Sequence, residues 1–227
     1  MTSKHRKSAH RRGVMTSLSL SVPERRAARI VFLGAAGVGK TALIARFLHD
    51  RFEPRHARTV EELHALECDL DGDAQLRLEM LDTSGSYAFP AMRALRIRTG
   101  DAFALVYSAR DRGSLEEARR LRDEILEIKG DAFDAITVVE SKSDLANRSR
   151  AENARAMRAV ELEWRAGFVS ASALTGENVA AVFRELLARA DLPSRVSPAL
   201  RRRRQMYSRN CGDEKTKMRK NNSCILS

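Results

Sequence analysis

The 227-residue sequence has few cysteines and no long apolar run. Its three cysteines, Cys68, Cys211 and Cys224, are too few for a disulfide framework, which indicates a reducing compartment. No segment approaches the roughly 20 apolar residues of a membrane-spanning helix. The first residues lack the apolar stretch of a secretory signal. We therefore expect neither a spanning helix nor a secreted, disulfide-stapled domain.

The charge of the chain is unevenly distributed. Hydrophobic residues make up 43% and charged residues 31%, which suits one domain with a core and two tails. Of the net charge of +11, residues 1–27 carry +6 and residues 195–227 carry +8, which leaves −3 for residues 28–194. The polar, basic tails are expected to be disordered. A nucleic-acid-binding domain normally has a basic face of its own, so the acidic middle argues against nucleic acid.

Apolar patterning predicts strands and helices in alternation around one hairpin. The expected strands are residues 28–33, 62–70, 74–81, 102–107, 136–140 and 167–171, and the expected helices are 40–50, 113–129, 151–163 and 177–189. Asp71-Gly72 is a hairpin signal, and Ser114 with Glu117 three residues later predicts a helix cap. This order predicts an α/β fold with a six-stranded, mostly parallel sheet and helices on both faces.

A phosphate-binding loop follows the first expected strand and opens the first expected helix. Its residues match G-x-x-x-x-G-K-[ST] without a gap: Gly34, Ala35, Ala36, Gly37, Val38, Gly39, Lys40 and Thr41. Glycines let backbone N–H groups surround phosphates, and the helix N-terminus adds a positive dipole end. Lys40 is predicted to reach the β- and γ-phosphates, and Thr41 to ligate Mg²⁺.

A second element for an anionic ligand is Asp82-Thr83-Ser84-Gly85, at the end of the third expected strand. Asp82 at this position is predicted to hold Mg²⁺ through water. The N–H of Gly85 is predicted to contact a γ-phosphate. D-x-x-G is a common pattern, and its weight comes from its place beside a phosphate loop.

With these motifs, residues 28–190 and the last four residues resemble a Ras-superfamily small GTPase of the Ras family. The segment 82–93 with the following D-A-F-A-L-V-Y is most similar to the Ras-dva group, and next to the dexamethasone-induced Ras and Rhes group. The resemblance implies a phosphate-loop NTPase G domain over residues 28–192, a basic tail before it (1–27) and a basic hypervariable tail after it (193–227). It also implies GTP or GDP with Mg²⁺ as ligands.

The resemblance assigns further roles residue by residue. Phe52 corresponds to the aromatic residue that packs edge-on against guanine, and Ala42 also contacts the nucleotide. Thr59 corresponds to the switch I threonine, which joins Mg²⁺ and the γ-phosphate, so that Lys40, Thr59 and Gly85 are the implied catalytic groups. The segment Val60, Glu61 and Glu62 resembles an effector-binding region, and its plainer alternative is a solvated acidic turn.

Base recognition is implied at two later segments. Ser141, Lys142 and Asp144 resemble the guanine-reading motif, while Ser172, Ala173 and Leu174 resemble the last guanine contact. Asp144 would accept hydrogen bonds from N1–H and the amino group of guanine. Adenine lacks this donor pair, so the carboxylate would stay unsatisfied and ATP would be rejected.

Four residues depart from the family pattern. Ser141 replaces an Asn and cannot make the paired bonds of an amide to the base and the phosphate loop, which predicts weaker nucleotide binding by about 1–3 kcal/mol. Leu174 replaces a Lys, with a small expected effect. Ser86 replaces the water-orienting Gln, and Ala36 replaces a Gly where an arginine finger approaches, so both predict slow hydrolysis.

Switch I departs as well, at His56, Arg58 and His64. The sharper interpretation of these changes is an altered choice of effector. The plainer one is neutral drift of surface residues.

The chain ends in Cys224-Ile225-Leu226-Ser227, a C-a-a-X box whose terminal Ser favours farnesylation of Cys224. A single lipid anchors weakly, and the basic tail supplies the second signal toward an anionic membrane. Cys211 is a further candidate for palmitoylation, with a plain reduced cysteine as the alternative. Arg201 to Arg204 are alternatively a nuclear localisation signal, which would give a nuclear pool.

Together these features predict a monomeric GTPase switch on the cytoplasmic face of the plasma membrane. Its expected partners are effectors, an exchange factor and a GTPase-activating protein, without nucleic acid. The alternative is a largely GTP-loaded binding scaffold that is controlled by expression level. A nucleic-acid-binding ATPase is disfavoured by Asp144 and the acidic middle of the chain.

Overall fold

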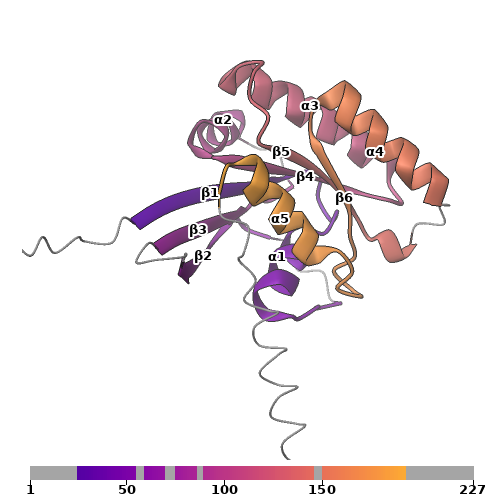
Figure 1. Cartoon of the computed structure of the whole chain (residues 1–227), viewed down its shortest axis with the longest axis horizontal. Coiled ribbons are helices and arrows are strands. Elements are labelled where there is room, and N and C mark those ends of the chain that lie inside the picture. The colour runs from indigo at the N-terminus through magenta and orange to yellow at the C-terminus, as the bar shows by residue number, and fades with distance from the viewer. Residues whose placement is uncertain (1–24, 55–58, 70–74, 86–88, 146–149, 193–227) are drawn as a thin grey trace, which may run out of the picture.

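A computed structural model describes residues 25–54, 59–69, 75–85, 89–145 and 150–192, which form one sheet and five α-helices (Figure 1). The strands are β1 (Arg25–Leu33), β2 (Glu62–Asp69), β3 (Gln75–Asp82), β4 (Ala102–Ser108), β5 (Ile136–Ser141) and β6 (Gly167–Ser170). The helices are α1 (Lys40–His49), α2 (Pro90–Thr99), α3 (Arg112–Lys129), α4 (Arg150–Trp164) and α5 (Val179–Arg189), with a 3-10 turn at η1 (Ser143–Leu145).

The sheet has the strand order β2-β3-β1-β4-β5-β6. β2 runs antiparallel to β3, and the other neighbouring pairs are parallel. The expected α/β class, with six mostly parallel strands, is therefore confirmed. Because the carboxyl ends of the parallel strands meet at one edge, the segments that follow β1, β3, β5 and β6 are brought to the same side of the sheet.

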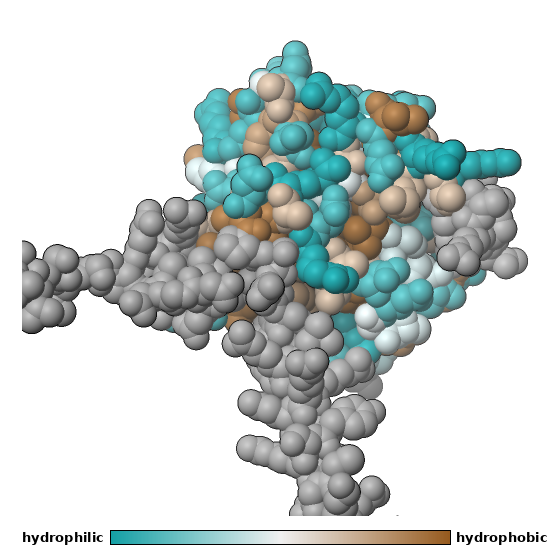
Figure 2. All heavy atoms as spheres, in the orientation of Figure 1, coloured by the Kyte–Doolittle hydropathy of each residue, from teal (hydrophilic) through white to brown (hydrophobic). Residues whose placement is uncertain are grey.

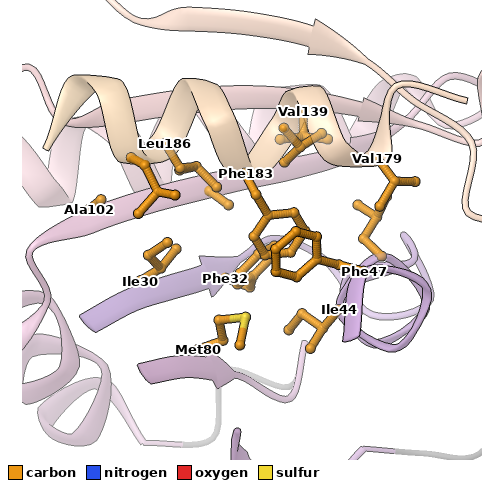
Figure 3. Packing of buried hydrophobic residues seen from close by; sticks show 14 of the residues in the cluster. Ile30, Phe32, Ile44, Phe47, Met80, Ala102, Val139, Val179, Phe183 and Leu186 are labelled. Atoms are coloured by element: carbon orange, nitrogen blue, oxygen red, sulfur yellow. The ribbon is translucent and has the colours of Figure 1, made fainter. Parts of the chain in front are cut away.

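Two separate hydrophobic clusters cover the two faces of this sheet. One lies under α1 and α5, where the Phe47 and Phe183 rings stack with centroids 3.6 Å apart and Phe32 of β1 packs against Phe183 (Figure 3). The other lies under α2, α3 and α4 and contains Ile97 and Trp164. Alternate residues of the buried strands point into each cluster, which explains why β4 and β5 are buried along their whole length.

The outer surfaces of the helices are mostly polar. Figure 2 shows hydrophilic residues over much of α3 and α4, with small separate hydrophobic areas between them. Leu162 of α4 is 79% exposed. Among the described residues, no helix combines the length and the apolar character needed to cross a bilayer.

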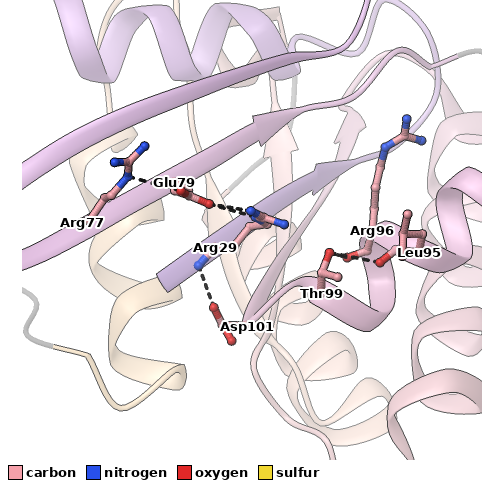
Figure 4. A network of polar contacts seen from close by, with 7 residues as sticks. All are labelled: Arg29, Arg77, Glu79, Leu95, Arg96, Thr99 and Asp101. Atoms are coloured by element: carbon pink, nitrogen blue, oxygen red, sulfur yellow. Dashed lines mark hydrogen bonds and ion pairs between the residues drawn. The ribbon is translucent and has the colours of Figure 1, made fainter. Parts of the chain in front are cut away.

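Strand β1 begins at Arg25, three residues before the expected start. Arg25, Arg26 and Ala27 pair with β3, so these residues of the expected tail belong to the sheet. A polar cluster holds this pair of strands: Arg29 forms an ion pair with Glu79 at 2.7 Å, and its backbone N–H donates to Asp101 at 2.7 Å (Figure 4). The hydrogen bond from Arg29 lowers the pKa of Glu79.

Two helical features differ from expectation. Helix α2 was not expected, and it begins with Pro90 in its first turn and buries Ile97 alone, which leaves little apolar periodicity to detect. Helix α3 is capped by Asp111, whose side chain accepts from the N–H groups of Gly113 and Ser114. The predicted cap at Ser114 is wrong, because its hydroxyl points back to the Asp111 carbonyl and the Ser108 N–H.

The Asp71-Gly72 turn lies outside the described residues.

Truncation of Phe183 tests the packing of α5 on α1. Phe183→Ala is expected to lower the free energy of unfolding by about 3–5 kcal/mol, because the ring is fully buried and its loss leaves a cavity. Urea unfolding followed by circular dichroism measures this change. Leu162→Ala, on the exposed side of α4, is the control and should change stability by less than about 0.5 kcal/mol.

Candidate functional site

The segment between β1 and α1 makes a close turn against the sheet. At its start, Gly34 has φ 143°, and a Cβ atom there would lie 2.1 Å from the carbonyl oxygen of Val106 in β4. Only glycine therefore fits at this position. Ala36 and Gly37 are exposed at the tip of the loop, while Val38 is buried beneath it. The tip of the loop is thus exposed at the surface.

Lys40, the first residue of α1, lies beneath this loop with 5% of its surface exposed. Its Nζ donates to the carbonyls of Gly34 at 2.8 Å and Ala35 at 2.9 Å. Burial lowers the pKa of the Lys40 amine to about 8, against the opposing effect of the Asp82 carboxylate. At neutral pH the amine therefore stays mostly protonated, as a cation ready for an anionic ligand.

Three oxygen-bearing side chains meet beside Lys40. Thr41 Oγ1 donates to Asp82 Oδ2 at 2.6 Å and lies 2.8 Å from Thr59 Oγ1. Because the single hydroxyl hydrogen of Thr41 is directed to Asp82, Thr59 is the donor in the second contact. These residues come from α1, β3 and the segment before β2.

This oxygen set fits Mg²⁺. Asp82 is fully buried, burial raises its pKa, and its Oδ1 has no hydrogen-bond partner among the described residues. A hard cation is the group that satisfies such an atom, and Mg²⁺ prefers oxygen ligands with several waters retained. No group of three His, Cys, Asp or Glu side chains occurs in the described part of the chain, so a site here depends on the threonine hydroxyls.

Gly85 lies directly against the phosphate loop. A Cβ atom on Gly85 would come within 2.2 Å of the backbone nitrogen of Ala36 and 2.5 Å of the carbonyl carbon of Ala35. This contact requires glycine at position 85. Next to it, the buried Thr83 hydroxyl donates to the Phe32 carbonyl of β1 at 2.6 Å and fixes the end of β3. Ser86 and the switch I residues His56 and Arg58 lie outside the described residues.

Ser141, at the end of β5, is buried against the same loop from the other side. Its hydroxyl contacts the carbonyl of Val38, and it lies 2.9 Å from the carbonyl of Tyr107. Of the two contacts expected of an amide here, the serine makes the one to the phosphate loop, at Val38. One hydroxyl has one hydrogen, however, so no second donor is left for a base.

The other residues predicted to read the base lie beside Ser141. Asp144 Oδ1 accepts from Ser172 Oγ at 2.5 Å, which joins the segments that follow β5 and β6. Lys142, with φ 57°, donates to the Gly37 carbonyl at 2.8 Å. Ala173 is buried, and Leu174 is 52% exposed at the rim.

Two predicted positions lie at the border of this arrangement. Phe52 is half-buried and packs against the cluster under α1 and α5. Ala42 belongs to α1 and packs against the same cluster.

The acidic segment before β2 is partly engaged within the molecule. Val60 is 85% exposed and Glu62 is largely exposed. Glu61 instead forms an ion pair with Arg96 of α2, whose Nε donates to Glu61 Oε1 at 2.6 Å. The alternative of a solvated acidic turn therefore does not hold for Glu61, because its side chain is paired with Arg96. Sequence reasoning missed Arg96 because α2 itself was not expected.

The fold and the site define a nucleotide-binding protein with a phosphate loop and a candidate Mg²⁺ position. The profile of the Ras family matches residues 29–191. The chain therefore belongs to the Ras family of small GTPases, which are GTP-hydrolysing signalling switches.

Individual relatives agree with this assignment. The chain is 38% identical over 194 residues to "GTP-binding protein Rhes" of Homo sapiens, covering 82% of this chain and 73% of the relative. It is 34% identical over 201 residues to "GTP-binding protein Di-Ras2" of Mus musculus, covering 87% and 96%. It is 37% identical over 162 residues to "GTP-binding protein Di-Ras1" of Homo sapiens, covering 70% and 79%.

Removal of one hydroxyl tests the candidate Mg²⁺ position. Thr41→Val keeps the shape of the side chain but removes the group that donates to Asp82. We expect the GDP affinity in Mg²⁺ to fall at least about tenfold, because one oxygen ligand is lost. GDP affinity in EDTA should change little, and titration calorimetry with and without Mg²⁺ measures both values. An equal loss in Mg²⁺ and EDTA would contradict a metal role for Thr41.

Proposed function

We propose that this protein is a membrane-anchored GTP/GDP-dependent signalling switch with slow intrinsic hydrolysis. The observation that carries this proposal is the contact between Gly85 and the loop residue Ala36. It places Gly85, whose N–H is the candidate contact for the γ-phosphate of GTP, directly against the phosphate loop. The next residue along the chain is Ser86, whose side chain is too short to orient an attacking water.

Binding of the phosphates would use groups that are already in position. The backbone amides of the loop and the Lys40 cation would bind the anion, and Thr41, Thr59 and Asp82 would hold Mg²⁺. When bound, Mg²⁺ supplies neutralisation of charge on the phosphate oxygens. In hydrolysis, water bonds to the γ-phosphorus and the bond to the bridging oxygen breaks, which releases phosphate and GDP.

Hydrolysis would therefore depend on electrostatic stabilisation by Lys40 and the loop amides. No described side chain at this site is suited to act as a general base. The methyl group of Ala36 stands at the exposed tip of the loop, where an arginine finger would have to approach. The lack of a general base among the described side chains of the site and the methyl group of Ala36 both favour slow turnover of GTP.

Guanine selection would rest on Asp144. Its carboxylate is oriented by the Ser172 hydroxyl at 2.5 Å and would accept from N1–H and the amino group of guanine. Adenine offers no such pair of donors, so binding of ATP would leave a desolvated carboxylate unsatisfied.

Partners and finer relationships follow from the surface and the sequence. Exposed Val60 and Glu62 form the candidate effector segment, and an exchange factor and a GTPase-activating protein are the expected regulators. Within the family, residues 82–93 favour the Ras-dva group, with the Rhes group second. The alternative function is a GTP-loaded scaffold, which Ala36 and Ser86 favour because both slow hydrolysis.

Membrane attachment would come from farnesylated Cys224 together with the basic tail. Each Lys or Arg near an anionic leaflet contributes about 1 kcal/mol. The proposed location is the cytoplasmic face of the plasma membrane. Cys224 and the tail lie outside the described residues.

The bound nucleotide and its turnover test the switch directly. Nucleotide released from purified protein and identified by ion-exchange chromatography should be GDP for a working switch, whereas GTP would favour the GTP-loaded scaffold. Single-turnover GTP hydrolysis should be slow, and the double variant Ala36→Gly with Ser86→Gln should be faster by at least about tenfold. Adenine nucleotide in the preparation, or rapid hydrolysis by the unaltered protein, would refute the proposal.

Restoration of an amide at position 141 tests the effect of the serine. Ser141→Asn adds a second hydrogen-bonding group, and GDP release should slow by about 5- to 150-fold, the equivalent of about 1–3 kcal/mol. Stopped-flow measurement with a fluorescent GDP analogue gives the rate. Because Ser141 is buried, thermal unfolding of the variant must first show that the fold is kept.

Loss of the lipid acceptor tests the anchor. Cys224→Ser should move a fluorescently tagged protein from membranes to a diffuse distribution, because the basic tail alone binds weakly at physiological salt. Cys211→Ser is the matched control and should leave attachment intact. Lasting membrane localisation of Cys224→Ser would contradict the lipid anchor, and nuclear accumulation would support the signal at Arg201 to Arg204.

A further inference from the structure

Glu140 is a fully buried carboxylate that the functions described above do not use. It lies near the end of β5 with 0% of its surface exposed, directly before Ser141. Carboxylates are rarely buried to this extent, because their removal from water costs free energy unless hydrogen bonds replace the lost hydration. Because it lies next to the segment proposed to read the base, this buried carboxylate is a candidate for a role in base recognition.

The side chain of Glu140 bridges three neighbouring strands. Its Oε1 accepts from the Tyr107 hydroxyl of β4 at 3.0 Å, and its Oε2 accepts from the Ser170 hydroxyl of β6 at 2.9 Å. Its backbone carbonyl accepts from the Ala171 N–H at 2.8 Å. Both the side chain and the backbone of one residue thus hold the end of β6 against β5.

Both segments that read the base begin at this bridge. Asp144 lies four residues after Glu140, and Ser172 lies two residues after Ser170. The two segments meet where the Ser172 hydroxyl donates to Asp144 at 2.5 Å, and where the Ser143 N–H donates to the Ala171 carbonyl at 3.2 Å. A shift of β6 along β5 would therefore move Ser172 away from Asp144.

We propose that Glu140 is a positioning residue for guanine specificity, which sets the Asp144 carboxylate through the bridge between β5 and β6. This inference rests on the proposed guanine-nucleotide function. The phosphates bind on the β1 side, where Lys40 is held by Gly34 and Ala35. Glu140 should therefore affect the choice of base more than the binding of phosphate. A purely structural role would instead weaken all nucleotides equally or lower stability alone.

Two ligands distinguish a positioning role of Glu140 from a purely structural one. GDP and inosine diphosphate differ by the 2-amino group of the base. This group is one of the two donors from which Asp144 would accept a hydrogen bond. The ratio of their affinities thus reports the position of the Asp144 carboxylate, while changes at the phosphates cancel. Titration calorimetry in Mg²⁺ gives both affinities, and ADP is measured for comparison.

Variants at position 140 change the bridge in two ways. Glu140→Met keeps the length of the side chain but has no oxygen acceptor, and we expect its GDP to inosine diphosphate ratio to fall about tenfold, the equivalent of about 1.4 kcal/mol. Glu140→Gln keeps one carbonyl oxygen as acceptor and should recover most of the ratio. Ser170→Ala removes a single partly exposed hydroxyl and should lower the ratio about threefold, so the test survives if Glu140→Met does not fold.

A matched control lies on the same strand. Thr137 of β5 is fully buried, and its hydroxyl has no partner among the described residues, so Thr137→Val should leave the ratio unchanged. A ratio that falls in Glu140→Met and Ser170→Ala but not in Thr137→Val supports the inference. An unchanged ratio in Glu140→Met and Ser170→Ala, with lower stability or equally weakened ligands, overturns it. If the unaltered protein prefers neither GDP to inosine diphosphate nor GDP to ADP, the proposed guanine function itself has failed.

Discussion

The close approach of the phosphate loop to the sheet is the constraint on which the site depends. Gly34 passes so near the Val106 carbonyl that no side chain fits, and Gly85 approaches the backbone of Ala36 with the same lack of space. These two contacts hold the loop against β4 and against the segment that follows β3. Lys40 can then donate to the carbonyls of Gly34 and Ala35 from beneath the loop.

The rest of the site follows from parallel strands whose carboxyl ends share one edge. Asp82 ends β3, Ser141 ends β5, and Ser172 follows β6, so the candidate Mg²⁺ position and the candidate base-reading residues lie at strand ends on one edge of the sheet. Side-chain hydrogen bonds between neighbouring strands then fix where these strand ends lie relative to one another. Glu140 joins β4, β5 and β6 in this way, just before the segments proposed to read the base.

The sequence predicted the sheet well because buried strands and the glycine-rich loop leave local signals. It missed α2, where only Ile97 is buried, and it misassigned the cap of α3 to Ser114 because both Asp111 and Ser114 are good cap residues. It also did not show that Ser141 keeps the contact to the phosphate loop. The Ser141 hydroxyl contacts Val38, which lies 103 positions away in the sequence, and no local sequence pattern indicates a contact between residues so far apart.

By itself, the sequence determined the family, the phosphate loop and the chemical identity of each site residue, because these depend on short motifs with fixed spacing. Only the tertiary structure decided which side chains touch. The ion pair between Glu61 and Arg96 and the bridge of Glu140 to Tyr107 and Ser170 join separate elements. Such contacts arise from strand order and helix packing, which are properties of the whole chain and not of any segment.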